Sequence, residues 1–240
     1  MLEGSNLRNF GHFLHQHPRF EDDDSAQLLK LSAQITTERS SAYIIKEGNA
    51  VETVITLVSG HAFQQKLTPA GSRQITHVFL PGEPLNFDSL FFSHSYCSVI
   101  ALTDVQLIAW KKNDFRELTA RVPNLFGAIF TTLAVQASML QERLLMIGRR
   151  AARDRVAHFL CEYAARCEAA GLSKADGSFF LPMTQEQIGD ALGLTSVHVN
   201  RTIRSLESEG LIQRFKYRVA IPQFAELASI GSFERGYLQL

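Results

Sequence analysis

The spacing of hydrophobic and polar positions changes twice along this chain of 240 residues. Before residue 40, apolar residues recur at helical spacing, with Leu28, Leu29, Leu31 and Ile35 on roughly one face. The acidic run EDDD ahead of them suits a helix N-terminus, where carboxylates meet the positive end of the helix dipole. The pattern therefore predicts short helices at the start of the chain.

From about residue 41 to residue 110 the chain consists of short runs rich in β-branched and aromatic residues. Turn-forming segments separate these runs, among them EGN, TPAGSR and LPGEP. Evenly spaced short strands divided by glycine and proline turns indicate a β-sandwich or β-barrel. We therefore expect a strand-rich domain here.

From about residue 113 to residue 170 the spacing is helical again. NDFRELTARVP predicts a first helix with Asn113 as N-cap and Pro123 as a break. The next helix is long, ends near a candidate hinge at Gly148, and carries an apolar stripe close to the a and d positions of a heptad. A second copy of the chain would bury this stripe, which consists of Phe126, Ile129, Leu133, Gln136, Leu140 and Ile147. Because Gln136 and Arg143 interrupt the pattern, a helix packed on its own domain is the alternative.

Residues 184–212 hold two short amphipathic segments joined at Gly193, where a turn needs positive φ. Thr184 and Gln187 have the spacing of a capping box. Gly189 lies where the two helices would cross. The second segment has a cap at Thr195 and an apolar stripe of Val199, Ile203 and Leu206. These features are typical of a helix-turn-helix, whose second helix enters the DNA major groove.

The outward face of that second helix predicts the DNA contacts. Its members are Ser196, Val197, His198, Asn200, Arg201 and Arg204. The following segment EGLIQRFKYRVAIP predicts a two-stranded wing whose basic residues suit phosphate contact: Arg214, Lys216 and Arg218. An ordinary packed helical hairpin is the alternative, but it does not require the capping box, both glycines and a basic wing together.

Charge and cysteine content narrow the setting. Lys and Arg (24) balance Asp and Glu (24), but residues 141–220 hold 12 basic against 9 acidic residues, whereas residues 1–140 hold 11 against 13. The positive excess therefore lies with the predicted DNA-binding part. The three cysteines form no CxxC pair, which favours reduced thiols. No apolar run approaches the roughly 20 residues of a membrane span and no signal core is present, so we expect a cytoplasmic protein without membrane contact.

Taken together, these motifs resemble transcription regulators of the Crp/Fnr family, named for the cyclic-AMP receptor protein and the fumarate–nitrate regulator. The resemblance covers about residues 20–230, is strongest in TQEQIGDALGLTSVHVNRTIRSLESEGLI, and includes LPGEPLNFDSLF as an outline of the family's PGxxxGExxLF segment. It implies an α+β fold with an N-terminal double-stranded β-helix (a jelly-roll, cyclic-nucleotide-binding-like domain), a long dimerisation helix and a C-terminal winged helix-turn-helix. The expected ranges are 1–120, 121–150 and 151–240.

The chain departs from the family at the effector site. Asn86-Phe87 stands where cyclic-nucleotide members carry Gly-Glu, and HSYCSV has no arginine where they carry Arg-Ser. A buried cyclic phosphate needs a cation or several donors, so cyclic AMP is not expected. The aromatic residues instead suggest an apolar effector pocket lined by Phe79, Glu83, Phe87, Phe91 and Tyr96, with a plain hydrophobic core as the alternative.

Other cofactors are weakly indicated. No cysteine precedes Cys97, so the N-terminal iron–sulfur cluster of some members is not expected. Haem stays open, because nominal ligands exist at His12, His15, His17, His61, His77 and His94, although surface or core histidines are the plainer interpretation. No metal site is predicted.

The recognition helix also differs from the better-known members, which carry a glutamate at the position of Val197. Arg201 matches the family arginine, which binds guanine through O6 and N7. The hypothesis is a homodimeric, sequence-specific transcription regulator that reads an inverted-repeat operator. Its partners would be double-stranded DNA, a second copy, RNA polymerase and an unidentified small-molecule effector.

Two alternatives come from other classes of protein. One is a ligand-binding β-roll protein whose winged helix mediates protein contacts. The other is a metal-dependent enzyme, which is disfavoured because no HxH…H pattern occurs between residues 41 and 110.

Overall fold

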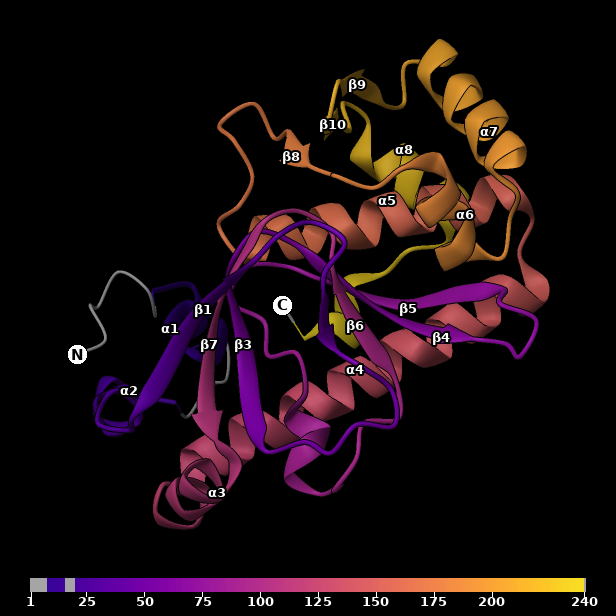
Figure 1. Ribbon diagram of the computed structural model, residues 1–240. Helices are drawn as coiled ribbons and strands as arrows, with labels where there is room; N and C mark the ends of the chain where they lie inside the picture. Colours follow the sequence, from indigo (N-terminus) through magenta and orange to yellow (C-terminus); the bar gives the residue numbers. More distant parts are fainter. Residues whose placement is uncertain (1–7, 16–19, 240) are drawn as a thin grey trace. The chain divides into compact units, whose positions relative to one another are not determined.

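The computed structural model describes residues 8–15 and 20–239 (Figure 1). They form two compact units. The first unit contains the described residues up to Lys66 and His77–Gln136, and the second contains Leu67–Thr76 and the chain from Ala137 onward. Strands come first, a long helix follows, and a helical region with a small wing completes the chain, which confirms the predicted α+β fold class.

Three short helices flank the strands of the first unit: α1 (Arg8–His15), α2 (Asp22–Leu29) and α3 (Lys112–Arg121). The acidic run does begin a helix, because Glu21 and Asp24 cap α2 reciprocally. The prediction that Ile35 continues this helical face is wrong, since Ile35 pairs with Ile108 in a sheet. Asn113 is not an N-cap either, because α3 starts directly from the preceding strand with Lys111 at that position.

The β-roll of the first unit is built on two sheets. The three-stranded sheet has the order β1-β7-β3 and contains β1 (Ala33–Glu38), β7 (Val105–Lys111) and β3 (Thr53–Ser59). The four-stranded sheet has the order β2-β6-β4-β5 and contains β2 (Tyr43–Ile45), β6 (Ser98–Ala101), β4 (Ala62–Leu67) and β5 (Arg73–Phe79). The short 3-10 helix η1 (Phe87–Leu90) follows β5. β2 to β7 thus confirm the short strands predicted between residues 41 and 110, whereas β1 was missed.

Two hydrophobic clusters form the interior of the first unit. One contains Leu57, Phe79 and Leu107 of the strands. The other is centred on Trp110, whose ring lies 5.5 Å from Phe10 and 5.6 Å from Phe115. Aromatic side chains thus fill the space where helices meet the roll, which bears directly on the predicted effector pocket.

Two long helices follow. α4 spans Pro123–Arg149 and α5 spans Ala152–Ala169. α4 ends one residue after Gly148, so the helical segment is interrupted at the predicted hinge. We call residues 149–152 the joint.

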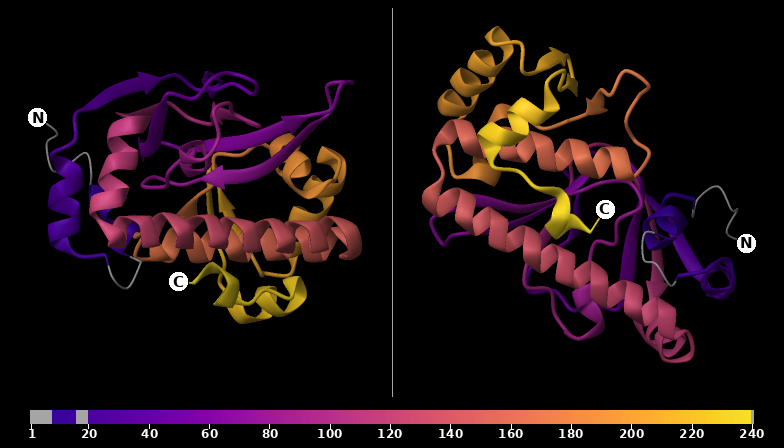
Figure 2. Two further views of the ribbon diagram at one scale, coloured as in Figure 1. Left: turned by 90° about the horizontal axis from the view of Figure 1, so that it is seen from below. Right: turned by 180° about the vertical axis from the view of Figure 1, so that it is seen from behind.

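The second unit contains α5, the pair α6 (Gln185–Leu192) and α7 (Ser196–Ser208), a small sheet, α8 (Phe224–Gly231) and the 3-10 helix η2 (Arg235–Leu238). The sheet has the order β8-β10-β9, with β8 (Phe179–Phe180), β10 (Arg218–Ala220) and β9 (Gln213–Phe215). The end of α8 lies directly against α5 (Figure 2, right), because a Cβ on Gly231 would sit 2.5 Å from the backbone nitrogen of His158.

Candidate nucleic-acid interface

The start of α6 is fixed by local hydrogen bonds. The backbone nitrogen of Gln187 donates to Thr184 Oγ1 at 3.2 Å, and the backbone nitrogen of Thr184 donates to Gln187 Oε1 at 2.8 Å. This is the predicted capping box, and it satisfies two backbone donors that a helix start would leave unpaired. The first helix of the pair therefore begins at a position that its own sequence specifies.

Two glycines set the turn between α6 and α7. Gly193 has φ 64°, a left-handed conformation that favours glycine. A Cβ on Gly189 would lie 2.5 Å from the carbonyl oxygen of Leu194, closer than any real contact. Both predicted roles are confirmed. The turn can hold the two helices at this separation only with glycine at these positions.

α7 divides into a buried and an exposed face. Thr195 caps it by accepting a hydrogen bond from the backbone nitrogen of His198, and Val199, Ile203 and Leu206 are buried as predicted. At its far end Arg153 of α5 pairs with Glu209, and this hydrogen bond, with a second from Ser205, lowers the pKa of Glu209 to about 2. Capped at one end and paired at the other, α7 is held as a rigid element that presents its outer face.

The outer face of α7 carries most of the residues predicted to contact DNA. Ser196, Val197, His198, Arg201 and Arg204 are exposed. Among the described residues, the guanidinium groups of Arg201 and Arg204 form no hydrogen bond and no ion pair. A guanidinium is permanently charged and has a planar fork of donors that matches phosphate or the guanine edge. Two such groups are therefore available to a partner outside the chain.

Asn200 lies half-buried on the same helix. Its Oδ1 is buried and has no hydrogen-bond partner within the described part of the chain. An unpaired buried acceptor is costly, and a donor supplied from outside would relieve that cost if the side chain rotated outward. An Asn side chain can pair with adenine through N6 and N7.

The three basic residues of the wing differ in how far their charged groups are already bound by other residues of the chain. Arg214 forms a two-pronged ion pair with Glu207, with Nε–Oε1 at 2.8 Å and Nη2–Oε2 at 2.6 Å. Arg218 donates to the carbonyl oxygen and the hydroxyl of Ser178, and so holds the segment before β8. Lys216 is exposed at the wing turn, with its ammonium 5.6 Å from the centre of the Tyr217 ring. Of the three predicted phosphate contacts, Lys216 has the least committed charge, and Arg218 has a structural role that the sequence did not reveal.

The structure does not gather the five residues of the predicted effector pocket into one cluster. Phe79 belongs to the cluster between the strands and Phe87 to the cluster around Trp110. Glu83 accepts from the backbone nitrogen of Leu80 at 3.1 Å and lies 3.3 Å from His77 Nε2. The remaining two aromatic residues are on the surface, with Phe91 55% and Tyr96 64% exposed. The plain-core alternative holds for Phe79 and Phe87.

The residues at the family's cyclic-nucleotide position do not fit such a ligand. Asn86 accepts a hydrogen bond from the backbone nitrogen of Ile55 at 2.8 Å and donates one to the carbonyl oxygen of Thr53 at 2.9 Å. Its amide thus pairs with the edge of β3 as a further strand would. Both polar atoms of the Asn86 side chain are therefore engaged within the chain, and Phe87 has no polar side-chain atom to bind a ribose.

The nominal haem ligands do not belong to a metal-binding group within the described part of the chain. Within the described residues, no three His, Cys, Asp or Glu side chains gather closely enough to hold a metal ion. His17 and the side chains of His12 and His15 lie outside the described residues. All three cysteines are free thiols, and burial raises the pKa of Cys161 to about 12.

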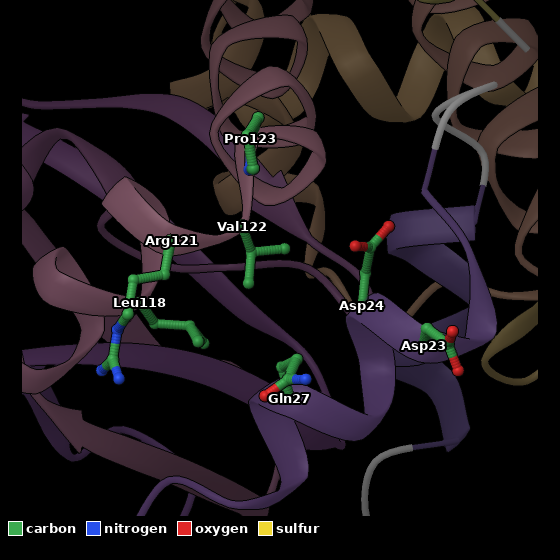
Figure 3. Close-up of a pocket in the computed structure, with 7 residues that line it drawn as sticks. All are labelled: Asp23, Asp24, Gln27, Leu118, Arg121, Val122 and Pro123. Carbon is green, nitrogen blue, oxygen red and sulfur yellow. The ribbon is translucent and has the colours of Figure 1, made fainter.

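A cavity of about 310 Å³ lies elsewhere in the first unit (Figure 3). Its lining comes from α2 and from the end of α3, namely Asp23, Asp24, Gln27, Leu118, Arg121, Val122 and Pro123. Two of its three charged side chains have partners: Asp24 Oδ2 accepts from Asn124 Nδ2 at 3.1 Å, and Arg121 pairs with Glu117. This cavity was not predicted, because the acidic run was fully explained as a helix start.

α4 exposes an apolar stripe that differs from the predicted one. Phe126 and Leu140 are exposed as expected of a dimer interface, and Leu133, Gln136 and Ile147 are half-buried. The prediction that Ile129 lies in the dimer interface is wrong, because Ile129 is 1% exposed and belongs to the core of its own chain. The most exposed large side chains on the helix are Phe130 (61%) and Leu144 (74%). A seam in steps of four and three residues therefore runs through Phe126, Phe130, Leu133, Ala137, Leu140 and Leu144.

Among the described residues, α4 is the one helix that bears on the expectation of no membrane span. By length and composition it is apolar enough to cross a membrane, and only 22% of its most apolar stretch is buried. Two of its charged residues, however, are paired with other residues of the second unit: Glu142 with Arg150, and Arg143 with Glu162. One side of α4 is therefore bound to its own chain by ion pairs. Only the other, apolar side remains to be buried against a partner.

Comparison with known proteins agrees with this geometry. Residues 154–230 match the Crp-like helix-turn-helix domain, and residues 39–122 match the cyclic nucleotide-binding domain. The nitrogen fixation regulation protein FixK of Bradyrhizobium diazoefficiens is 31% identical over 173 residues, which are 72% of this chain and 71% of that protein. The transcriptional activator protein FnrL of Cereibacter sphaeroides is 28% identical over 214 residues, which are 85% of this chain and 84% of that protein. The solved structure of FixK2 from Bradyrhizobium japonicum has a TM-score of 0.77 at 25% identity and covers 85% of this chain and 100% of that one.

A β-roll, a long helix and a winged helix-turn-helix with an open basic face define a DNA-binding transcription regulator. The chain belongs to the Crp/Fnr family. The members of this family are transcription regulators rather than enzymes, and they bind DNA and dimerise.

Proposed function

We propose that this chain acts as a homodimer that reads an inverted-repeat operator with the exposed face of α7. The observation that carries the proposal is the pair Arg201 and Arg204, which are exposed and have no partner within the described chain. Two copies of α7 in a symmetric dimer would enter major grooves about one helical turn apart. Each copy would bind one half-site.

Within one half-site the side chains have different roles. Arg201 binds a guanine through O6 and N7, and Ser196, Val197, His198 and Asn200 set the preference at neighbouring base pairs. Val197 replaces polar readout with an apolar contact suited to a thymine methyl group. Arg204 and Lys216 contact phosphates, which adds affinity for any sequence. The preferred operator should therefore differ from those of members that carry glutamate in place of Val197.

The exposed seam of α4 is the proposed dimer interface. A continuous apolar stripe this long needs a cover, and the same stripe from a second copy supplies one by coiled-coil packing. The ion pairs of Glu142 and Arg143 tie the other side of the helix to its own chain. A second helix, rather than lipid, therefore suits the exposed side. RNA polymerase is a further partner that we propose. Because both DNA and RNA polymerase are in the cytoplasm, we propose that location for the protein.

We also propose that the protein does not use cyclic AMP. The engagement of Asn86 by β3 supports this, as does the burial of Phe87 in the core. Any effector of the β-roll would need a different site and different chemistry from those of the cyclic-nucleotide members. No iron–sulfur or haem cofactor is part of the proposal.

Salt dependence of duplex binding tests the proposal against the rival in which the winged helix binds protein. Fluorescence anisotropy of a labelled duplex would be followed over a range of salt concentrations. Counterion release predicts a steep fall of affinity with salt, and the double variant Arg204→Ala/Lys216→Ala, which removes both proposed phosphate contacts, should flatten that slope by about two units. Duplex binding that is absent, or a slope that the double variant does not change, would favour the rival.

A further inference from the structure

A buried polar cluster in the second unit is not explained by DNA binding. His158 of α5 is fully buried, and its ring stacks on Tyr237 of η2 and meets Phe233 edge-on. His158 Nε2 lies 3.0 Å from the Tyr237 hydroxyl, which donates to Glu162 Oε2 at 2.8 Å. Two segments far apart in the sequence are thus joined through one imidazole.

The other ring nitrogen faces two groups that demand opposite roles of it. His158 Nδ1 lies 2.7 Å from Nη1 of Arg150, which is only a donor, and 3.0 Å from the carbonyl oxygen of Gly231, which is only an acceptor. Nδ1 can satisfy only one of them at a time. The protonation state of the ring decides which.

The Tyr237 hydroxyl settles the tautomer of the neutral ring. Because its proton goes to the Glu162 carboxylate, its oxygen can only accept from His158, so Nε2 carries the ring proton. Nδ1 is then an acceptor and binds Arg150. Arg150 lies in the joint, and its Nη2 pairs with Glu142 of α4 at 3.1 Å. The neutral imidazole therefore fastens the joint to α5 and, through Arg150, to the end of α4.

We propose that His158 is a proton-sensitive latch on the joint between α4 and α5. When neutral, it accepts a hydrogen bond from Arg150. When protonated, it donates to the carbonyl of Gly231 and repels Arg150, which releases the joint. The C-terminal segment completes the latch, since Gly231 and Tyr237 hold the ring in place.

The charged groups around the ring come from each element packed on it. α4 contributes Glu142 and Arg143, the joint contributes Arg150, α5 contributes Glu162, and η2 contributes the hydroxyl of Tyr237. α8 contributes the Gly231 carbonyl. The two arginines and two carboxylates balance while the ring is neutral. A proton on His158 adds an uncompensated positive charge beside Arg150.

The direction of the pH dependence follows from this environment. Burial lowers the pKa of His158, and Arg150 lowers it further, against opposing effects of Glu162 and the Gly231 carbonyl. In an opened joint the ring reaches water and regains its ordinary pKa of about 6.5. The open form then binds the proton more tightly. The closed latch is therefore fully stable above about pH 6.5 and is lost as the pH falls toward the lower pKa of the closed form.

Hydrogen exchange in the full-length protein without DNA tests the latch. Amide exchange of residues 146–153 would be measured between about pH 7.5 and about pH 5.5 and corrected for the intrinsic rate. Between the two pKa values, the opening equilibrium should rise by up to about tenfold per pH unit. His158→Gln cannot take up the proton and should show no such rise. Wild-type exchange that is level with pH, or a rise that persists in His158→Gln, would overturn the proposal.

Arg150→Gln gives an independent test, which also serves if His158→Gln does not fold. Removing the guanidinium takes away the donor of the latch and a charge that lowers the pKa of His158 in the closed form, so the rise of exchange with falling pH should become smaller. A rise as large as that of the wild type would contradict the latch. If the pKa of His158 is followed directly by NMR, its resonance is assigned as the one that is absent in His158→Gln.

The consequence for DNA rests on the proposed function. Operator affinity should fall over the same pH range in which exchange of the joint rises. Exchange that responds to pH while operator affinity stays level would refute the link between latch and DNA. Absence of duplex binding at neutral pH would refute the proposed function, whereas the exchange experiment would still decide the latch.

Discussion

The outer face of α7 and the interior of the β-roll treat their functional side chains in opposite ways. On α7, Arg201 and Arg204 are exposed without partners in the described chain. In the β-roll, Asn86 and Glu83 are fully engaged by backbone groups and by His77. Phe79 and Phe87, which could have lined a ligand site, instead fill two separate cores. One region keeps its binding groups for an external partner, and the other uses them to hold itself together.

The geometry of the turn gives the largest expected effect. Gly189→Val should destabilise the second unit by about 3 kcal/mol and abolish operator binding, because its Cβ meets the Leu194 carbonyl oxygen at 2.5 Å. Thermal unfolding and anisotropy would measure the two effects. Gly148→Ala is the matched control, since its Cβ would meet nothing within 4 Å. Normal binding by Gly189→Val would show that the turn does not set the presentation of α7.

Breaking the seam should come next in size. Leu144→Glu places a charge on the most exposed apolar residue of α4, and we expect monomers in sedimentation velocity and a loss of binding to the two-half-site duplex of at least about tenfold. Phe91→Glu changes a comparably exposed apolar residue outside α4 and should leave the protein dimeric. A dimeric Leu144→Glu variant would place the interface elsewhere.

The β-roll side of the comparison predicts a pure stability effect. Asn86→Ala leaves two backbone groups of β3 without partners, which should cost about 2–4 kcal/mol of unfolding free energy. Denaturant unfolding would measure the loss. Operator affinity measured well below the unfolding midpoint should not change. A selective change in operator affinity with intact stability would reveal a ligand role for Asn86.

Substitutions of Arg201 test whether α7 reads bases. Arg201→Ala should cost about 1–3 kcal/mol on the preferred duplex and relax one base-pair position. Arg201→Lys is the control, because it keeps the charge but loses the two-pronged donor geometry. It should retain the salt slope and still lose the preference at that position. An unchanged base preference in both variants would remove Arg201 from base readout.

Lys216 should give the smallest effect. Lys216→Ala should weaken binding to all duplexes alike and reduce the slope of affinity against salt by about one unit. The measurement is anisotropy with the preferred duplex and with a scrambled duplex. A loss confined to the preferred duplex would contradict a phosphate contact.

How far the sequence predicts this molecule depends on the range of the forces involved. The helix-turn-helix was predictable almost residue by residue, because capping by Thr184 and Thr195 and the turn at Gly193 are local effects. The short strands between residues 41 and 110 followed in the same way from their β-branched and aromatic content and from turn chemistry. The fold class was therefore within reach of the sequence alone.

The errors concern tertiary packing. Ile35 kept a helical spacing but joined a sheet, because pairing with β7 outweighed its local pattern. Ile129 fitted a heptad yet packs in its own core, since the side of α4 that faces the chain is set by distant residues. The aromatic residues predicted to line an effector pocket do not gather, and the reason is the same. Periodicity does not reveal what a side chain packs against.

The most direct test of the central claim is selection of bound DNA from a random duplex pool by the purified protein without added ligand, followed by sequencing. We predict a two-fold symmetric motif with a guanine in each half-site, and the loss of that guanine preference in a parallel selection with Arg201→Ala. A pool that shows no symmetric motif, either alone or after addition of a cell extract, would contradict the claim that α7 of a dimer reads an operator.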